Sequence, residues 1–217
     1  MFLIITTVII SARTLLRLEF MKTSGNKQAQ WRSKVATAAL GSIGREGMKG
    51  ASLRAIAREL ESTTGVLTHY FRNKDELLLF VLETIMNRLG EIMVEAAEGI
   101  EGLQRLKVMM LAILPTTPEL VTIWRAWLAF VGSALGHAAL VNEHQRHYAN
   151  LKAFIYEEFA ALQAAGQIGS NLDLDFEAAA WIATFDGIGV NMIAAPQSYS
   201  HQQLDTLVSR YLKTLEL

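Results

Sequence analysis

The sequence predicts an all-α protein with a small helix–turn–helix head at the front and a larger helical body behind it. Three observations favour this fold class. Apolar residues recur at helical spacing along most of the chain, Ala, Leu, Glu, Gln and Met fill long stretches, and only three prolines occur in 217 residues. At 51% hydrophobic and 19% charged residues, the chain can bury a sizeable core.

Charge is distributed unevenly along the chain. Residues 22–75 contain ten Lys/Arg and four Asp/Glu, whereas residues 76–217 contain eight basic and sixteen acidic residues. The net charge of −1 therefore conceals a basic head and an acidic body. A cationic head of this kind indicates a polyanionic partner.

Residues 1–21 stand apart from the rest. Their apolar run, Phe2–Ile10, is much shorter than the roughly 20 residues that cross a bilayer. No positive charge precedes the run and the small-residue cleavage signal after it is poor, so a signal peptide is not indicated. We interpret residues 1–21 as a disordered extension or a misassigned start; the alternative is a short membrane-adhering or packing segment.

Several classes of chemistry lack their usual signals. There are no cysteines, which excludes disulfides and thiolate metal sites and suits a reducing cytoplasm. The motifs G-x-S-x-G, H-E-x-x-H, the P-loop and G-x-G-x-x-G do not occur. His144 and His147 are three residues apart, but no fitting set of carboxylates accompanies them. We therefore expect no catalytic residue, no metal, no cofactor and no membrane partner.

The sequence at the front of the chain predicts three helices in succession. The first covers Gln28–Arg45, the second covers Leu53–Leu60 behind the N-cap residue Ser52, and the third covers Thr64–Tyr70 after the turn Glu61-Ser62. Two short helices joined by a tight turn, with a supporting helix before them, form a helix–turn–helix. The residues expected to end the first helix are Gly44, Gly47 and Gly50.

The second helix of such a pair lies in the major groove of DNA, with its N-terminal residues toward the base edges. Hydroxyls and a glycine at its start suit close approach to bases and phosphates, and Tyr70, Lys74 and Ser52 can reach flanking phosphates. The alternative for Tyr70 is a place in the core, and for His69 simple solvation. The residues predicted to contact DNA are Ser52, Thr63, Thr64, Gly65, Thr68, His69, Tyr70 and Lys74.

The stretch AIARELESTTGVLTHYFRNKDELL resembles the DNA-binding signature of TetR-family transcriptional regulators. The chain departs from it at Leu60-Glu61-Ser62, where the family often has Ala-Gly-Val, and at Thr68, where many members have tyrosine. The hydroxyl residue followed by His-Tyr-Phe is more similar to the choline/betaine-repressor (BetI-type) branch. The residues that match the family pattern are Thr63-Thr64-Gly65, Tyr70-Phe71, Lys74 and Leu77.

The body predicts six further helices. Asn73 is expected to cap the first of them, with Glu76 three residues on completing a capping-box-like pattern. Prolines and glycines separate the others. The expected helices cover Asp75–Glu98, Leu103–Leu114, Glu119–Leu135, His137–Ala165, Asp175–Ala194 and Gln202–Leu215.

The body also resembles the BetI-type C-terminal domain, through WRAWLAF at residues 124–130 and DFEAAAWIATFDGI at residues 175–188. The resemblance implies a homodimer in which the last two long helices pair with those of a second subunit as a four-helix bundle. A two-fold dimer can present two heads to major grooves about 34–36 Å apart on a palindrome. The residues expected at the interface are Ala178, Trp181, Ile182, Phe185 and Gly189. The small residues Ala179, Ala183 and Gly187 of the same helix are also expected to allow close approach of the two subunits.

The resemblance further implies an effector pocket in the body. Aromatic faces there can hold a quaternary ammonium by cation–π attraction, and Glu143 or Asp186 can add negative charge. The alternative is that these aromatic residues are plain core. The residues expected to form the pocket are Trp124, Trp127, Phe130, His144, Tyr148, Phe154 and Trp181.

Together these features predict a cytoplasmic, homodimeric transcriptional repressor that a small-molecule effector releases from a palindromic double-stranded DNA operator. The resemblance to the BetI-type branch implies a choline-like effector, one that carries a quaternary ammonium. We expect a DNA-binding domain over residues 22–75 and an effector-binding and dimerisation domain over residues 76–217. Two alternatives stay open: the same fold responding to a hydrophobic drug or metabolite, and a helical membrane-associated protein that regulates nothing. A nonspecific architectural DNA binder is disfavoured, because the body is acidic.

Overall fold

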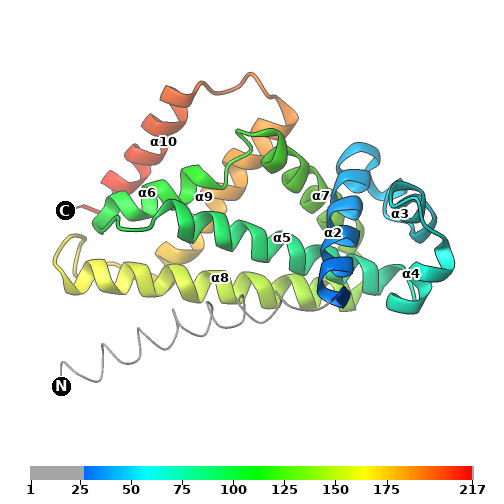
Figure 1. The fold of residues 1–217 in the computed structure, drawn as a ribbon. Helices are drawn as coiled ribbons and strands as arrows, with labels where there is room; N and C mark the ends of the chain where they lie inside the picture. The colour runs from blue at the N-terminus through cyan, green and yellow to red at the C-terminus, as the bar shows by residue number, and fades with distance from the viewer. Residues whose placement is uncertain (1–26, 217) are drawn as a thin grey trace.

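This computed structural model describes residues 27–216 of the chain. They contain nine α-helices and one short 3-10 helix, joined by turns and loops (Figure 1). No strand occurs in that part, so the predicted all-α fold is confirmed. The expected extension over residues 1–21 lies outside the described residues, as does the start of the expected head domain at residues 22–26.

The helices agree with the predicted ranges to within two residues at either end. The one element that was not predicted is the 3-10 helix η1. The head contains α2 (Lys27–Glu46), η1 (Gly47–Lys49), α3 (Leu53–Glu59) and α4 (Thr64–Tyr70); the body contains α5 (Lys74–Ala96), α6 (Gly102–Ala112), α7 (Pro118–Ala134), α8 (Ala138–Ala164), α9 (Leu174–Ala194) and α10 (His201–Lys213).

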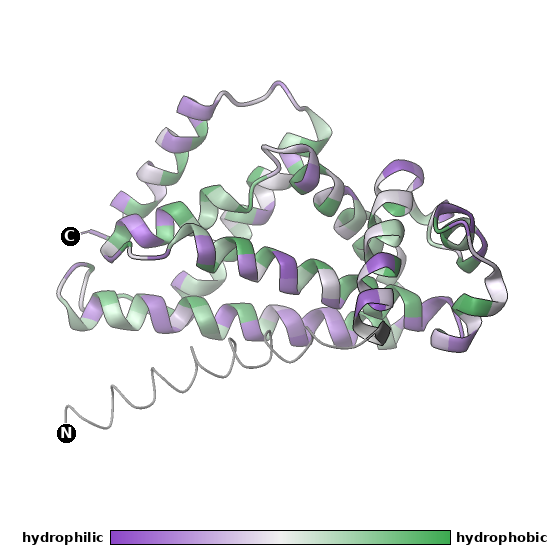
Figure 2. Cartoon of the chain, in the orientation of Figure 1, coloured by the Kyte–Doolittle hydropathy of each residue, from purple (hydrophilic) through white to green (hydrophobic). Residues whose placement is uncertain are grey.

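The head lies at one end of an elongated body (Figure 1). Helix α2 contacts α3 within the head and both α5 and α7 of the body. In the body, α8 packs on α9 and α5, while α6 contacts α5 and α10. Hydrophobic and hydrophilic residues alternate along α5 and α8 (Figure 2), as expected for helices with one buried face.

The contact between the head and α7 depends on Gly44. This residue does not end α2, as the sequence predicted, because the helix continues to Glu46. An ideal Cβ on Gly44 would lie 2.9 Å from Cγ2 of Thr122, so the absence of a side chain lets α2 and α7 approach closely. Gly47, with φ of +60°, is the residue at which the chain leaves the helix.

The buried apolar residues of the head and the body form one continuous cluster, which extends from Val35 in α2 to Leu215 after α10. The head and the body therefore share one core. Within residues 27–216, none of the helices is both long and apolar enough to cross a lipid bilayer.

Candidate functional site

The helix predicted to contact DNA, α4, is held to the head by one apolar side. Leu67 has no accessible surface, and Phe71, the residue after the helix, is buried against Phe80 with ring centroids 5.3 Å apart. The polar residues of the helix are exposed on the other sides. The exposed residues that were predicted to contact DNA are Thr63, Thr64, Gly65, Thr68, His69 and Lys74.

Three hydroxyls in this region have different local roles. Ser52 caps α3, because its Oγ accepts a hydrogen bond from the Ala55 amide at 3.1 Å. Thr63 occupies the N-cap position of α4 without a side-chain capping bond, so its hydroxyl is available to an external partner. Thr68 Oγ1 donates to the carbonyl oxygen of Gly65 at 3.1 Å.

Tyr70 is half-buried, between the core position and the exposed position considered for it. Its ring packs against Trp31 of α2, with centroids 6.2 Å apart, and meets His69 edge to face at 5.3 Å. It therefore helps to fix α4 on α2 while keeping part of its surface accessible.

The step from the head to α5 is built by reciprocal hydrogen bonds. Asn73 Oδ1 accepts from the Glu76 amide at 2.9 Å, which confirms the predicted cap. The Glu76 carboxylate accepts from the amide of Arg72 at 2.6 Å and from its guanidinium Nε at 2.7 Å. In the expected capping box, Glu76 would accept from the amide of Asn73, so the observed bond to Arg72 lies one residue earlier. The bonds from Arg72 also hold the pKa of Glu76 below its usual value.

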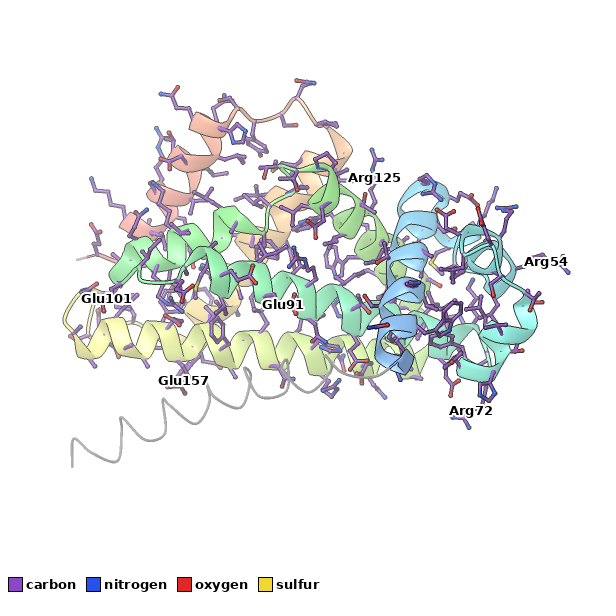
Figure 3. The ribbon with its side chains drawn as sticks, in the orientation of Figure 1. Arg54, Arg72, Glu91, Glu101, Arg125 and Glu157 are labelled. Carbon is purple, nitrogen blue, oxygen red and sulfur yellow. The ribbon has the colours of Figure 1, made fainter. Side chains whose placement is uncertain are left out.

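Ion pairs use only part of the positive charge of the head. Arg45 binds Glu59 at 2.7 Å, and Arg72 binds Glu76. Among the described residues, Lys74 and Arg54 have no ion-pair partner. Figure 3 shows Arg54 and Arg72 pointing outward from the head, away from the body.

The body encloses a cavity of about 500 Å³ between α5, α7, α8 and α9. Four of the seven predicted pocket residues line it: Trp124, Trp127, Tyr148 and Phe154. Phe130, His144 and Trp181 do not. Phe130 and Trp181 are buried in the core, and His144 lies behind the wall, stacked on Tyr148 at 4.3 Å between ring centroids.

Asp186 is the ionisable group set into the aromatic part of this cavity. Its Oδ2 accepts a hydrogen bond from the Tyr148 hydroxyl at 2.8 Å, while its buried Oδ1 has no partner among the described residues. Burial raises the pKa of Asp186 from 3.8 to about 6. The same burial, with the nearby Asp186 charge, raises the pKa of Tyr148. The other candidate carboxylate, Glu143, is not part of the cavity wall and pairs with Arg146.

One wall of the cavity was not anticipated from the sequence. Helix α5 contributes residues from Glu83 to Val94, mostly apolar, and one end of the cavity also carries Arg146 and His147. Burial lowers the pKa of His147. Helical spacing indicated that α5 had a buried face, but no residue pattern distinguishes a face that lines a cavity from one that is fully packed. No group of three His, Asp or Glu residues among those described is arranged to bind a metal.

The structure separates the residues expected at the dimer interface into two groups, of which the first is Ala178, Trp181, Ile182, Phe185 and Gly189. All five lie inside the subunit: Ala178 and Trp181 have no accessible surface, and Gly189 faces Trp124 of α7. Side chains that are already buried cannot form a second interface. The opposite face of α9 is exposed instead, and it carries Phe176, Ala179, Ala183, Gly187 and Val190.

An exposed polar helix in a helix–turn–helix head, joined to a helical body, is typical of transcriptional regulators. Comparison with known families gives the same answer. A family described as bacterial regulatory proteins of the tetR family matches residues 36–81, and one described as the C-terminal part of BetI-type transcriptional repressors matches residues 102–216. The chain belongs to the TetR family of DNA-binding transcriptional regulators and has a BetI-type C-terminal part.

Individual relatives agree with this assignment. The regulator PksA of Bacillus subtilis (strain 168) is 24% identical over 186 residues, which cover 85% of this chain and 89% of PksA. The regulator BetI of Escherichia coli (strain K12 / DH10B) is 28% identical over 131 residues, which cover 59% of this chain and 67% of BetI.

Solved structures share the fold. A TetR-family regulator from Rhodococcus sp. superposes with a TM-score of 0.77 at 22% identity, covering 86% of this chain and 98% of that one. A transcriptional regulator from Saccharomonospora viridis in complex with choline gives a TM-score of 0.75 at 20% identity, covering 85% and 96%.

Proposed function

We propose that the protein is a homodimeric repressor that releases a palindromic operator when an organic cation with an apolar portion occupies the body cavity. The observation that carries the proposal is the position of Asp186, a half-buried carboxylate in a cavity whose walls include Trp124, Trp127 and Tyr148. We further propose a DNA-binding domain over residues 22–75, a body domain over 76–217, and a cytoplasmic location.

The chemistry of the cavity favours a cation over a neutral ligand. Burial leaves ionised Asp186 poorly solvated and raises its pKa, and a bound positive charge would relieve that cost. Aromatic faces attract cations through the ring quadrupole, and the attraction strengthens when water is excluded. The similar Saccharomonospora viridis structure contains choline, which is such a cation.

The volume of the cavity favours a ligand larger than a bare ammonium group. About 500 Å³ is within the range of sites that hold drug-sized molecules. The stretch of α5 from Glu83 to Val94 extends the wall by roughly 16 Å at 1.5 Å per residue. Its apolar side chains suit an alkyl or aryl portion attached to the cation. A purely neutral hydrophobic ligand is a weaker candidate, because it would leave Asp186 unpaired.

A second copy of the chain would bind through the exposed face of α9. Phe176 is 65% exposed and Val190 37% exposed, and the residues between them on this face are small. Small residues allow two helices to approach closely, and a large exposed apolar side chain gains most from coverage. Leu207 of α10 is also partly exposed and can extend the surface.

Helix α7 provides the physical connection between the cavity and the head. Trp124 forms part of the cavity wall, and Thr122, two residues earlier, touches Gly44 of α2. A ligand that displaces α7 therefore displaces α2. DNA favours one separation of the two heads and the ligand another, so that each weakens binding of the other.

Lys74 tests the DNA contact directly. Lys74→Ala should weaken binding to all duplexes and lower the slope of log affinity against log salt by about 1 for each bound subunit. Lys213→Ala removes the same charge from the far end of the body and should leave the slope unchanged. An unaltered slope in Lys74→Ala would show that this residue does not contact phosphate.

Thr64→Ala or His69→Ala should instead change which DNA sequences the protein selects. Equal loss of affinity on all sequences would argue against base reading by either side chain.

Gly90 offers a test of the cavity. It lies in the wall with no atom within 4 Å of an ideal Cβ, so the larger side chain of Gly90→Leu should occupy part of the cavity. The operator is first selected from random duplexes, and its release is then titrated with choline, decyltrimethylammonium and decanol. Decyltrimethylammonium should release the wild type and Gly132→Leu, a matched exchange at another helical glycine with free space, but not Gly90→Leu. Release that is the same in Gly90→Leu, or release by decanol alone, would contradict the proposed cation site.

A further inference from the structure

We propose that Val66 is a specificity-determining residue that recognises the 5-methyl group of a thymine in each operator half-site. The proposal rests on the proposed insertion of α4 into the major groove. Val66 was not among the residues predicted to contact DNA, yet 41% of it is exposed on this helix.

The position of Val66 follows from the geometry of α4. Successive residues in an α-helix are rotated by about 100°. Leu67 points into the head with no accessible surface, so Gly65 and His69 lie on the opposite, outward side. Val66 and Thr68 flank that side. Because Gly65 has no side chain, the side chains nearest to an approaching groove at this level are those of Val66 and Thr68.

These two flanking residues present mainly methyl groups. Val66 has no polar atom in its side chain. The hydroxyl hydrogen of Thr68 is used in the bond to the Gly65 carbonyl oxygen at 3.1 Å, which leaves an acceptor oxygen and a methyl group for an outside partner. The middle of the recognition surface is therefore apolar, while Thr63, Thr64 and His69 supply the polar groups around it.

In the major groove, only one natural base edge offers a matching apolar group. Thymine carries a 5-methyl group, and contacts between apolar side chains and this methyl are a recognised means of distinguishing bases. Uracil has the same hydrogen-bonding groups as thymine but lacks the methyl, and 5-methylcytosine has the methyl with a different hydrogen-bonding edge. A single exposed valine is common on protein surfaces. Val66 has this role because it flanks the outward side of α4 next to Gly65, which has no side chain.

The experiment replaces thymines in the selected operator by deoxyuridine, one position at a time and in both half-sites together. At the thymine that Val66 contacts, deoxyuridine should lower the affinity of the wild type about fourfold per half-site, as expected for the loss of one buried methyl group. Val66→Ala should bind the thymine operator more weakly and show no further loss with deoxyuridine at that position. Leu135→Ala, which also shortens an exposed apolar side chain but in the body and outside the cavity wall, should keep the full sensitivity.

Two results would overturn the role of Val66: a wild type that tolerates deoxyuridine at every position, or a Val66→Ala variant that remains equally sensitive. Both would leave the proposed repressor function intact, because the operator would still be bound. Failure of the wild type to bind any duplex at low salt would instead remove the proposed function itself. A Val66→Thr variant keeps one methyl group and should retain part of the sensitivity.

Discussion

The indole of Trp124 occupies the space beside Gly189 that any other side chain would need. An ideal Cβ on Gly189 would lie 2.0 Å from Cη2 of Trp124, far closer than real contacts allow. Trp124 is also anchored by a hydrogen bond from its Nε1 to the carbonyl oxygen of Ile113 at 2.8 Å. Gly189 thus joins α9 to α7 within one subunit, next to the cavity.

Gly189→Ala should lower the free energy of unfolding by about 1–3 kcal/mol, because an overpacked core must displace Trp124. Urea denaturation followed by circular dichroism measures the change. Gly132→Ala is the matched control: no atom lies within 4 Å of its ideal Cβ, so alanine should stabilise the helix by up to about 1 kcal/mol. Equal stability of the two alanine variants would mean that α7 and α9 do not meet as described. A Trp124→Leu exchange should recover part of the loss in Gly189→Ala.

Glu61 lies in the turn between α3 and α4 with φ of +50°, the left-handed region that disfavours side chains. It is the only residue other than glycine with such a backbone among residues 27–216. Glu61→Gly should therefore be neutral or stabilise by up to about 1 kcal/mol, because relieved strain exceeds or offsets the added flexibility of glycine. Glu61→Val should destabilise by about 1 kcal/mol or more, because a β-branched residue fits this region worst. Thermal unfolding measures both, and a valine variant as stable as the glycine variant would show that the turn has another conformation.

The recognition helix could be predicted to the residue because its signals are local. Thr64–Tyr70 begins after Thr63, a residue type that favours the N-cap position, and ends shortly before Asn73, the N-cap residue of the next helix. The unusual turn before this helix was also apparent, since the family often has glycine where this chain has Glu61.

The faces of α9 could not be assigned in this way. The helix is apolar almost all round, with Trp181 and Phe185 on one side and Phe176 and Val190 on another. Periodicity then gives no preferred face, and tertiary contacts with α7 and α8 decide which side is buried. The lining of the cavity could be predicted only in part for the same reason. The aromatic residues of α7 and α8 were identified, but the opposing wall depends on where α5 lies.

The affinity for an organic cation should depend on pH through Asp186. The pKa of Asp186 is raised to about 6, so its carboxyl is neutral at pH 5 and negatively charged at pH 8. Tetramethylammonium, whose charge does not change with pH, should bind about tenfold more tightly at pH 8 than at pH 5. Isothermal titration calorimetry measures the affinities. Asp186→Asn should bind weakly at both values, and His147→Gln should keep most of the dependence, since His147 also lines the cavity.

The same carboxyl affects stability without ligand. A carboxyl whose pKa is raised in the folded state binds more protons folded than unfolded, so stability falls as pH rises from about 4 to about 6. Asp186→Asn should remove this fall. At pH 8 its free energy of unfolding should exceed that of the wild type by about 1–3 kcal/mol. At pH 4 the two proteins should differ little. A pH profile of stability that is identical in both would show that Asp186 is not buried in the folded protein.

The exposed face of α9 should control oligomeric state. Ala183→Glu places a charge at the centre of the proposed interface, where an unpaired carboxylate would lose its water. Because Ala183 is exposed in the subunit, the fold should be retained, with an unchanged helical circular dichroism signal. Sedimentation velocity at micromolar concentration should then show a monomer, whereas the wild type and Ala149→Glu, a control on the exposed side of α8, should remain dimers. The monomer should also lose its preference for palindromic over single half-sites, because that preference requires two linked heads. A dimeric Ala183→Glu protein would place the subunit interface on another surface.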